Sequence, residues 1–252
     1  MKKVLVTFWI PKEVAGEYSQ EIELIYPQEE ITGQYSMEEI KSMLPEVDAV
    51  LIGMERFTKE IIDLGKNLKA IGRLGVGCDN VDYEYAGQKG IAVINTPSSV
   101  TQPTAELTIA ILLSVARCIP SLDKRVRKNK RCIATPSYEK KSTNVFGKVL
   151  GIIGFGRIGK AVAEKAKGLG MEVIYSDIVK APKEVEEAIG AKKVTTEELL
   201  KTADFVSLHC PYVPENHHLI NKDTLALMKE GAYLINASRG NIVDEAALVE
   251  AL

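Results

Sequence analysis

The chain has 252 residues, of which 46% are hydrophobic and 26% are charged, and its formal net charge at pH 7 is −2. This length predicts one large domain or two modest ones, and the composition excludes a disordered chain. The small net charge gives no overall attraction to nucleic acid or to an anionic membrane. No apolar run approaches the roughly 20 residues that a membrane span needs.

Short apolar runs alternate with helical patterns in the first part of the chain. Ser36 opens a helix through a capping box with Glu39, and Thr58 begins another helix that ends at Gly65. The alternation predicts a parallel sheet with helices on both faces. The predicted strands are Lys3–Trp9, Ile22–Tyr26, Val47–Gly53, Lys69–Leu74 and Ile91–Ile94.

A long helix is predicted next, with Pro103 in its first turn and its end near Ala116. It is apolar nearly all round, so we expect it to be buried between two sheets or domains. Residues 124–131 then carry six basic residues in eight. A nucleic-acid arm is one interpretation, but aromatic residues are not interleaved there, and we favour a solvated helix end and loop.

A second alternating series begins at Lys148, and it predicts a second α/β unit joined to the first near residues 97–101. Its predicted strands are Val149–Ile153, Glu172–Tyr175, Asp204–Leu208 and Ala232–Asn236. Its predicted helices are Arg157–Leu169, Thr196–Lys201 capped by Thr195, Lys222–Met228, and Glu245–Leu252, which directly follows Asp244.

A glycine motif, Gly154-x-Gly156-x-x-Gly159, directly follows the strand Val149–Ile153 and opens a helix. In this setting the first glycine permits a tight turn, the second lets the backbone approach a pyrophosphate, and the third allows close packing of helix and strand. The helix N-terminus supplies free amides for the phosphates. Asp177 ends the next strand, where it would accept from the ribose hydroxyls and repel a 2′-phosphate. The motif therefore predicts NAD rather than NADP.

Two further loops follow strands, and each has an alternative interpretation. Gly75–Gly77 exposes consecutive amides, but it is equally consistent with a plain strand-to-helix turn. Arg239 follows a strand of the second series and is suited to clamp a carboxylate, although an exposed loop arginine is the simpler interpretation from spacing alone. The histidines at positions 209, 217 and 218 are interpreted as structural or surface residues rather than as general acids.

The segments together resemble the D-isomer-specific 2-hydroxyacid dehydrogenases, which include D-lactate, phosphoglycerate and glycerate dehydrogenases. The resemblance covers nearly the whole chain in one consistent order. The matching stretches are Gly72–Asp82, Asn95–Pro97 with Ala105-Glu106, Gly151–Gly159, His209–Pro211, and Met228-Lys229 through Asn236–Glu245.

This resemblance implies an α/β enzyme of two doubly wound parallel-sheet domains with NAD in the cleft. Residues 1–98 would be a flavodoxin-like substrate domain, and residues 99–252 a Rossmann NAD-binding domain. Amides of Gly75, Val76 and Gly77 would hold the substrate carboxylate, and Arg239 would bind that carboxylate and polarise the carbonyl. The implied cofactor contacts are Gly154, Gly156, Arg157, Ile158, Gly159, Asp177, His209, Cys210, Pro211, Asn216, Ala237, Ser238 and Arg239.

The chain also departs from the family pattern. The family's catalytic His, in a Pro-His pair, and its partner Glu lie downstream of the arginine, and the residues after Arg239 contain no His. We therefore expect a C-terminally shortened dehydrogenase that lacks the last strands and the closing helix. The alternative is an NAD-binding protein without turnover. A different Rossmann enzyme, such as a methyltransferase, would leave Arg239 and the Gly75–Gly77 loop unexplained.

The family resemblance implies the substrate class and the assembly, while the charge and the cysteine pattern indicate the other partners and the location. We expect a small 2-hydroxy or 2-oxo acid as substrate and a homodimer as the assembly, with no nucleic-acid or membrane partner. Arg73 precedes the carboxylate-binding loop and would either meet a substrate phosphate or pair with a nearby carboxylate. Cytoplasmic location is expected. The four cysteines (Cys78, Cys118, Cys132 and Cys210) lie far apart and predict neither a metal site nor a disulfide framework.

Overall fold

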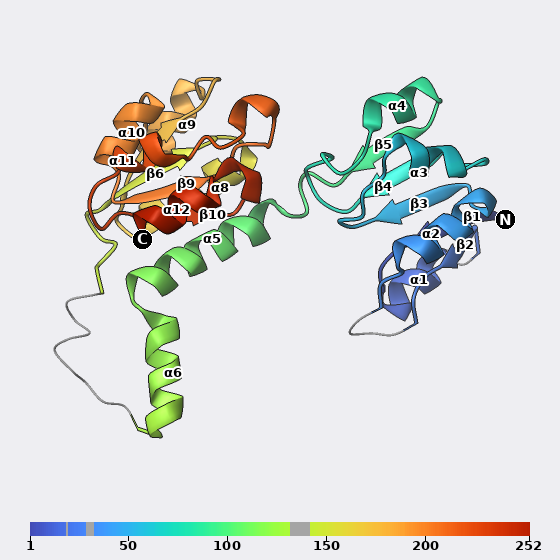
Figure 1. The fold of residues 1–252 in the computed structure, drawn as a ribbon, viewed down its shortest axis with the longest axis horizontal. Helices are drawn as coiled ribbons and strands as arrows, with labels where there is room; N and C mark the ends of the chain where they lie inside the picture. The colour runs from blue at the N-terminus through green and yellow to red at the C-terminus, as the bar shows by residue number, and fades with distance from the viewer. Residues whose placement is uncertain (19, 29–32, 132–141) are drawn as a thin grey trace. The chain divides into compact units, whose positions relative to one another are not determined.

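The protein is described here by a computed structural model, which describes residues 1–18, 20–28, 33–131 and 142–252. The chain divides into two compact units, Met1–Val100 and Thr101–Leu252 (Figure 1). Both units are built from parallel strands and intervening helices, which confirms the predicted α/β class. Cys132, one of the four cysteines considered above, lies outside the described residues.

The first unit contains one five-stranded parallel sheet in the order β2-β1-β3-β4-β5, the arrangement of flavodoxin-like domains. Its core gathers aliphatic side chains such as Leu5, Ile40, Ile52 and Ile71 around Phe57, all of them inaccessible to solvent. The elements are β1 (Lys2–Val6), α1 (Lys12–Tyr18), β2 (Ile22–Ile25), α2 (Met37–Met43), a 3₁₀ turn (Leu44–Glu46), β3 (Ala49–Ile52), α3 (Lys59–Leu64), β4 (Ala70–Arg73), α4 (Tyr83–Gln88) and β5 (Ala92–Asn95).

Local signals account for the helix starts in this unit. The Ser36 hydroxyl accepts from the Glu39 amide, and the Glu39 carboxylate accepts from the Ser36 amide at 2.8 Å, so the predicted capping box is confirmed. The helix after Thr58 also ends at Gly65 as predicted. Helices α1 and α4 were not predicted, because each spans two turns or fewer, and the Asp82 side chain at the start of α4 makes no capping hydrogen bond.

The second unit contains a five-stranded parallel sheet in the order β10-β9-β6-β7-β8. The strand order reverses between β6 and β9, and ligands of open α/β sheets bind outside the carboxyl ends of strands at such a point. The elements are α5 (Thr101–Ala116), α6 (Ile119–Asn129), β6 (Val149–Ile153), α8 (Arg157–Gly168), β7 (Glu172–Ser176), α9 (Lys183–Ile189), β8 (Ala191–Lys193), α10 (Thr196–Thr202), β9 (Phe205–Leu208), a 3₁₀ turn (Pro214–Asn216), α11 (Lys222–Ala226), β10 (Tyr233–Asn236), a 3₁₀ turn (Gly240–Ile242) and α12 (Glu245–Ala251).

Helices cover both faces of this second sheet. One core includes side chains of α5, α8 and α9, among them Leu112 and Val162. The other includes side chains of α10, α11 and α12, among them Leu199 and Leu200. The unit is therefore doubly wound, as predicted. Helix α9 and strand β8 were missed, because the strand has three residues and only Ala191 in it is buried.

Within its own unit the long helix α5 is buried on one side, and its burial between two sheets or domains stays a prediction for the other side. Ala105, Thr108 and Leu112 of α5 are fully buried, whereas Leu107, Ile111 and nearby Val115 are 58%, 36% and 39% exposed. The helix packs against α8 and β10 on one side, so the apolar residues of the opposite side reach solvent.

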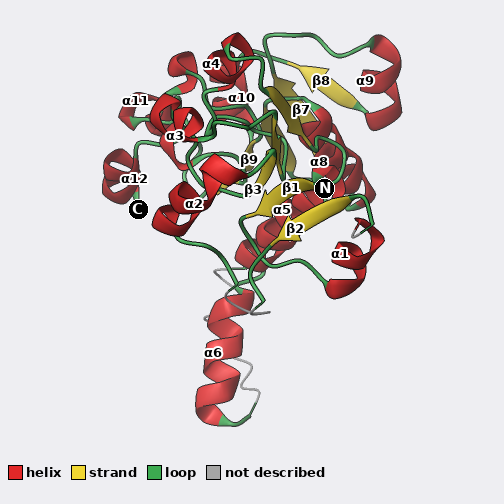
Figure 2. Ribbon diagram, turned by 90° about the vertical axis from the view of Figure 1, so that its right-hand side faces the viewer, coloured by secondary structure: helices red, strands yellow, loops and turns green. Residues whose placement is uncertain are grey.

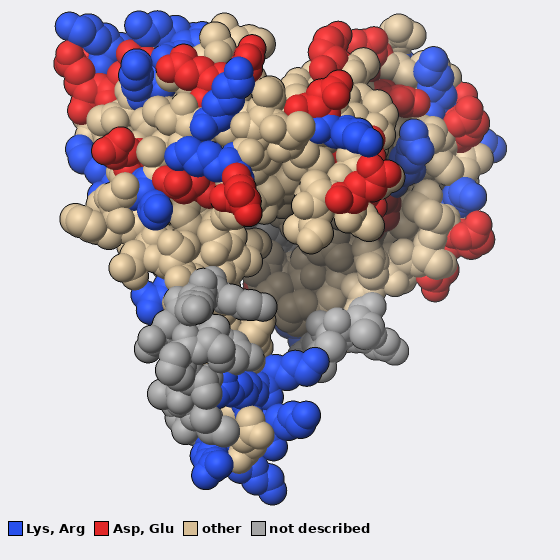
Figure 3. Space-filling model, turned by 60° about the vertical axis from the view of Figure 1, so that its left-hand side comes forward, with Lys and Arg blue, Asp and Glu red and all other residues tan. Residues whose placement is uncertain are grey.

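Helix α6 extends away from the sheet of its own unit in both ribbon views (Figures 1 and 2). None of its residues is buried, and its basic side chains face solvent, which confirms the predicted solvated helix end (Figure 3). In the described residues no single helix is long and apolar enough to cross a membrane. Only α5 and α6 taken together reach the required length and composition, and they are bent by 62° at the break.

Candidate functional site

The glycine loop lies at the carboxyl end of β6, where the strand order of the second sheet reverses. Gly154 has φ of +93°, a conformation that L side chains rarely adopt. A Cβ on Gly154 would lie 2.4 Å from the Cys210 amide nitrogen and 2.6 Å from the His209 carbonyl carbon. Glycine is therefore required here for two reasons, the turn itself and the close approach of the segment that follows β9.

The other two glycines have opposite surroundings. Gly156 caps the N-terminus of α8, and a Cβ there would meet no atom within 4 Å. A Cβ on Gly159 would lie 2.2 Å from the Gly154 carbonyl oxygen, so this glycine lets the helix pack onto the loop. The open side of Gly156 leaves room for a ligand at the start of a 12-residue helix, whose first amides and dipole favour a phosphate.

The first turn of α8 begins with Arg157 and Ile158, which the sequence placed among the cofactor contacts. The Arg157 side chain is exposed, whereas Ile158 is half-buried and packs against the core. Gly154, by contrast, is buried. The N-cap Gly156 and the first helical residue Arg157 are therefore exposed, directly after the buried turn at Gly154.

Asp177 follows β7, and its carboxylate is already engaged by the backbone. Its Oδ2 accepts from the Phe155 amide at 2.6 Å, and its Oδ1 accepts from the Val179 amide at 2.9 Å. The first of these bonds joins Asp177 to the glycine loop. The spacing predicted that the acidic residue and the loop lie together, but it did not indicate that the Phe155 amide fixes the carboxylate.

The segment after β9 passes beside the glycine loop. The His209 amide donates to the Ile153 carbonyl at 2.7 Å, and the Nε2 atom of its ring lies 2.8 Å from the Ser207 hydroxyl oxygen. Burial lowers the pKa of His209 to about 4, so its ring is neutral at pH 7. A neutral, buried imidazole is a poor proton donor, which agrees with the interpretation of His209 as structural. The nearby Cys210 is buried, and burial raises the pKa of its thiol.

The rest of this segment is held by a side chain of the following turn. The Asn216 side-chain amide donates to the Pro211 carbonyl at 2.8 Å. The Tyr212 hydroxyl oxygen lies 3.2 Å from the Nδ1 atom of His217, and the His217 ring stacks on that of His218. The predicted contacts Pro211 and Asn216 thus lie together.

Arg239 lies in a compact loop after β10. The Asn236 side chain organises this loop: its oxygen accepts from the amide of Ser238 at 3.0 Å, and its nitrogen donates to the Arg239 carbonyl at 2.8 Å. Ala237, Ser238 and Arg239 are half-buried, and the guanidinium donates to the Ser238 carbonyl at 3.1 Å. Asn236 was not singled out as an organising residue from the sequence, although Asn at a strand end is a frequent turn former.

The amides of the Gly75–Gly77 loop, in the first unit, are held from the neighbouring strand end. The Gly75 amide donates to the Thr96 hydroxyl at 2.8 Å, and the Asn95 side chain donates to the Val76 carbonyl at 2.7 Å. The amides of Val76 and Gly77 make no hydrogen bond within the part of the chain that the structure describes. Two of the three predicted amides are thus available to a ligand, and Thr96 occupies the third.

Thr96 and Asn95 were missed as loop-holding residues. The signal that points to them is the strand register, in which Asn95 of β5 lies opposite Arg73 of β4. The loops that follow the two strands are then adjacent. The sequence contains both segments, but the pairing of β4 with β5 is known only from the fold.

Arg73 is buried below the same loop, with 7% of its surface exposed. Its guanidinium donates to the Leu74 carbonyl and to the Met54 sulfur. Gly75 has φ of +132°, and the Arg73 side chain occupies the space that a Cβ at Gly75 would need. These contacts of Arg73 thus hold the loop itself, and Gly75 is needed to make room for the guanidinium.

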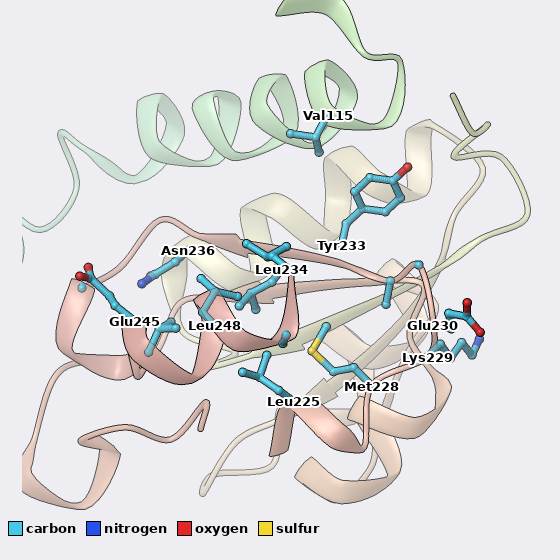
Figure 4. Close-up of a pocket in the computed structure, with 16 residues that line it drawn as sticks. Val115, Leu225, Met228, Lys229, Glu230, Tyr233, Leu234, Asn236, Glu245 and Leu248 are labelled. Carbon is cyan, nitrogen blue, oxygen red and sulfur yellow. The ribbon is translucent and has the colours of Figure 1, made fainter. Parts of the chain in front are cut away.

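A groove of about 670 Å³ follows β10 on the second unit (Figure 4). Its walls are mainly aliphatic, with Val115 from α5 and Leu248 from α12, and Lys229 and Glu230 lie at one end. None of the glycine-loop residues lines it, and neither does Asp177. The candidate cofactor site therefore lies outside this groove. Within the described ranges no group of three or more His, Cys, Asp or Glu side chains is arranged to hold a metal ion.

Comparisons with known proteins agree on one family. Residues 109–252 match the model described as "D-isomer specific 2-hydroxyacid dehydrogenase, NAD binding domain". Over 99% of its length the chain is 38% identical to a glyoxylate reductase of Thermococcus onnurineus, of which it covers 75%. Over 82% of its length it is 46% identical to a glyoxylate reductase of Thermococcus litoralis, of which it covers 63%.

Among solved structures, a D-lactate dehydrogenase of Aquifex aeolicus complexed with NAD and lactic acid is similar over 99% of this chain. The chain covers 73% of that structure, with 30% sequence identity and a TM-score of 0.81. The chain thus spans between three fifths and three quarters of the lengths of these three proteins.

Proposed function

Since the chain belongs to the D-isomer-specific 2-hydroxyacid dehydrogenase family, we propose that it transfers a hydride between NAD(H) and the C2 carbon of a small D-2-hydroxy acid or 2-oxo acid. NAD as cofactor and the oxidoreductase class are confirmed by the matched NAD-binding model and the NAD-bound lactate dehydrogenase. The main support for the proposal is the packing around the glycine loop. Gly156 is open to a ligand, while Gly154 and Gly159 are closely packed.

The residues of this loop fit the cofactor. We propose that the α8 amides beginning at Gly156 bind the pyrophosphate and that Asp177 accepts from the ribose hydroxyls. When bound, NADH supplies the hydride, and the chain supplies binding, orientation and charge. The remaining proposed cofactor contacts are Gly154, Arg157, Ile158, Gly159, His209, Cys210, Pro211, Asn216, Ala237, Ser238 and Arg239.

For the substrate, we propose that the amides of Val76 and Gly77 bind the carboxylate. Thr96 supports this assignment, because it holds the preceding amide and so fixes the loop. Arg239 would clamp the carboxylate and polarise the C2 carbonyl, since a guanidinium presents two parallel donors. Arg73 would act from below the loop, as a buried cation near the carboxylate.

A second candidate function is NAD binding without turnover. It is favoured by the state of the three histidines: His209 is neutral and bonded to Ser207, His217 meets Tyr212, and His218 faces Asp244 across 3.9 Å. None of them is placed in the Pro-His pair that serves the family as proton donor. Loss of general acid–base help typically lowers a rate by about 10²–10⁴-fold.

The test is oxidation of NADH by the 252-residue chain with a panel of 2-oxo acids that includes glyoxylate, measured beside NADH binding by fluorescence. The dehydrogenase proposal expects turnover that depends on the 2-oxo acid and is lost in Arg239→Lys. NADH affinity should be largely kept, because lysine keeps the charge but lacks the planar fork that clamps the carboxylate. Saturable NADH binding with no turnover on any 2-oxo acid would select the second function. Absence of NADH binding would contradict both.

We also propose a homodimer in the cytoplasm. The exposed apolar side of α5 supports the dimer, since Leu107, Ile111 and Val115 recur at helical spacing on the second unit. The cytoplasm is supported by the cofactor, because an NAD-dependent reaction needs an intracellular supply of NAD. Sedimentation of the wild type against Leu107→Glu tests the dimer, which we expect the charge to dissociate, and an unchanged dimer would contradict the choice of surface.

A further inference from the structure

The segment from Asp177 to Ala181 joins β7 to the start of α9, and its hydrogen bonds to the rest of the unit lie at its two ends. Ile178 is fully exposed and Val179 is 69% exposed, so the side chains of its middle do not pack against the unit. At the first end, the Asp177 carboxylate accepts from the Phe155 amide. The position of the whole segment therefore also depends on what holds its second end.

Tyr175 holds that second end. Its side chain is fully buried, and its phenol oxygen accepts from the Ala181 amide at 2.9 Å while donating to the Glu186 carboxylate at 2.6 Å. Its ring also stacks on that of Phe155, with 3.9 Å between centroids and 16° between planes. Burial raises the pKa of Tyr175, so the phenol stays protonated at neutral pH and continues to donate. One side chain thus contacts both the glycine loop and the far end of the segment.

Glu186 of α9 contacts the one cation of this segment. Its second carboxylate oxygen lies 3.7 Å from the Lys180 ammonium, and the Glu186 side chain is 15% exposed while that of Lys180 is 67% exposed. Residues 177–181 contain no other basic residue. An ammonium near the ribose site would attract the 2′-phosphate of NADP, and the ion pair with Glu186 competes with that attraction.

We propose that Tyr175 and Glu186 are positioning residues that set the preference for NADH over NADPH. Tyr175 keeps the segment in the position from which Asp177 faces the ribose, and Glu186 keeps Lys180 engaged. The inference rests on the proposed function, in which Asp177 accepts from the ribose hydroxyls. It adds to that function two residues that the cofactor does not need to touch.

The experiment compares dissociation constants of NADH and NADPH, measured by nucleotide fluorescence, for the wild type and four variants. Tyr175→Phe should raise the Kd for NADH by about fivefold and leave that for NADPH unchanged, because a lost hydrogen bond loosens Asp177. Glu186→Gln should lower the Kd for NADPH by about threefold and leave that for NADH unchanged, because Lys180 is released. Tyr85→Phe is the matched control, since the Tyr85 phenol also donates to a carboxylate, that of Asp63 in the first unit.

The fourth variant, Asp177→Ala, tests the ribose contact separately from the positioning role of Tyr175 and Glu186. If it abolishes the discrimination against NADPH while Tyr175→Phe and Glu186→Gln do not alter it, the positioning role is refuted and the ribose contact stands. If Asp177→Ala leaves the discrimination intact, the ribose contact is refuted and the inference falls with it. Equal weakening of both nucleotides by Tyr175→Phe, with a lowered melting temperature, would mean that Tyr175 acts only in stability and would also refute the positioning role.

Discussion

Alanine substitutions at three glycines of helix α8 separate the binding role of its N-terminus from its packing role. A methyl group at Gly156 would meet no protein atom within 4 Å, whereas one at Gly159 would lie 2.2 Å from the Gly154 carbonyl oxygen. Gly168, in the last turn of the same helix, also has open space around a Cβ and is the matched control. The same glycine-to-alanine change should therefore have a different outcome at each of the three positions.

The magnitudes follow from these surroundings. Gly168→Ala should raise stability by about 0.5–1 kcal/mol, because alanine loses less backbone freedom on folding. Gly159→Ala should lower it by about 1–3 kcal/mol, because the clash is with backbone that must shift. Gly156→Ala should leave stability unchanged or raise it by up to about 1 kcal/mol. Its methyl group would occupy the proposed pyrophosphate side and raise the Kd for NADH by about 5–150-fold, which corresponds to a clash of about 1–3 kcal/mol.

Thermal unfolding and NADH fluorescence titration measure the two effects on the same samples. For a chain of this size a change of 1 kcal/mol shifts the melting temperature by about 2–4 °C. The expected pattern is weakened NADH binding in Gly156→Ala, with a melting temperature that is unchanged or raised by up to about 4 °C, and unchanged binding in Gly168→Ala. If Gly156→Ala binds NADH as tightly as the wild type, the pyrophosphate does not bind against this glycine.

Three further predictions test other parts of the site. Asp177→Ala should bring the Kd values of NADH and NADPH closer together in fluorescence titrations, and an unchanged ratio would contradict the ribose contact. Thr96→Val should raise the KM for a 2-oxo acid with little change in the Kd for NADH, because it releases the Gly75 amide. Steady-state kinetics measure this KM, and an equal weakening of 2-oxo acid and NADH binding would indicate misfolding. Burial lowers the pKa of His209 to about 4, below the ordinary 6.5. The unfolded chain therefore takes up this proton at a higher pH than the folded chain does, and the free energy of unfolding should fall as the pH drops from 6.5 toward 4. Urea unfolding across this range should show a smaller decrease in His209→Gln, and an equal decrease would contradict the assignment.

The sequence predicted the α/β class and the glycine motif because both depend on local signals. Strand Val149–Ile153 has the bounds that its apolar run indicates, and the helix after it begins at Arg157 as expected. The bond between the Asp177 carboxylate and the Phe155 amide was not predictable, since it depends on how two loops of neighbouring strands approach each other. The roles of Tyr175 and Glu186 were missed for the same reason.

The burial of α5 shows a different limit. Its composition indicates an apolar helix, but composition does not tell which side of it meets its own sheet. Leu112 is fully buried and Leu107 is mostly exposed, although both are leucines of one helix. The loop amides show a similar limit: the sequence indicated three equivalent donors, and the pairing of strands decides that Thr96 occupies that of Gly75.

Transfer of deuterium from NADH to a 2-oxo acid shows whether this chain is a D-2-hydroxyacid dehydrogenase. The 252-residue chain would be incubated with NADH labelled with deuterium at C4 of the nicotinamide, on the face that the enzyme uses, and with glyoxylate or a larger 2-oxo acid. The products would be separated by chiral chromatography, and their deuterium content would be measured by mass spectrometry. We expect a larger 2-oxo acid to yield the D-2-hydroxy acid with one deuterium at C2. Three results would contradict this expectation. They are a product of the L configuration, a product that carries no deuterium whichever face of NADH is labelled, and no reduction of any 2-oxo acid.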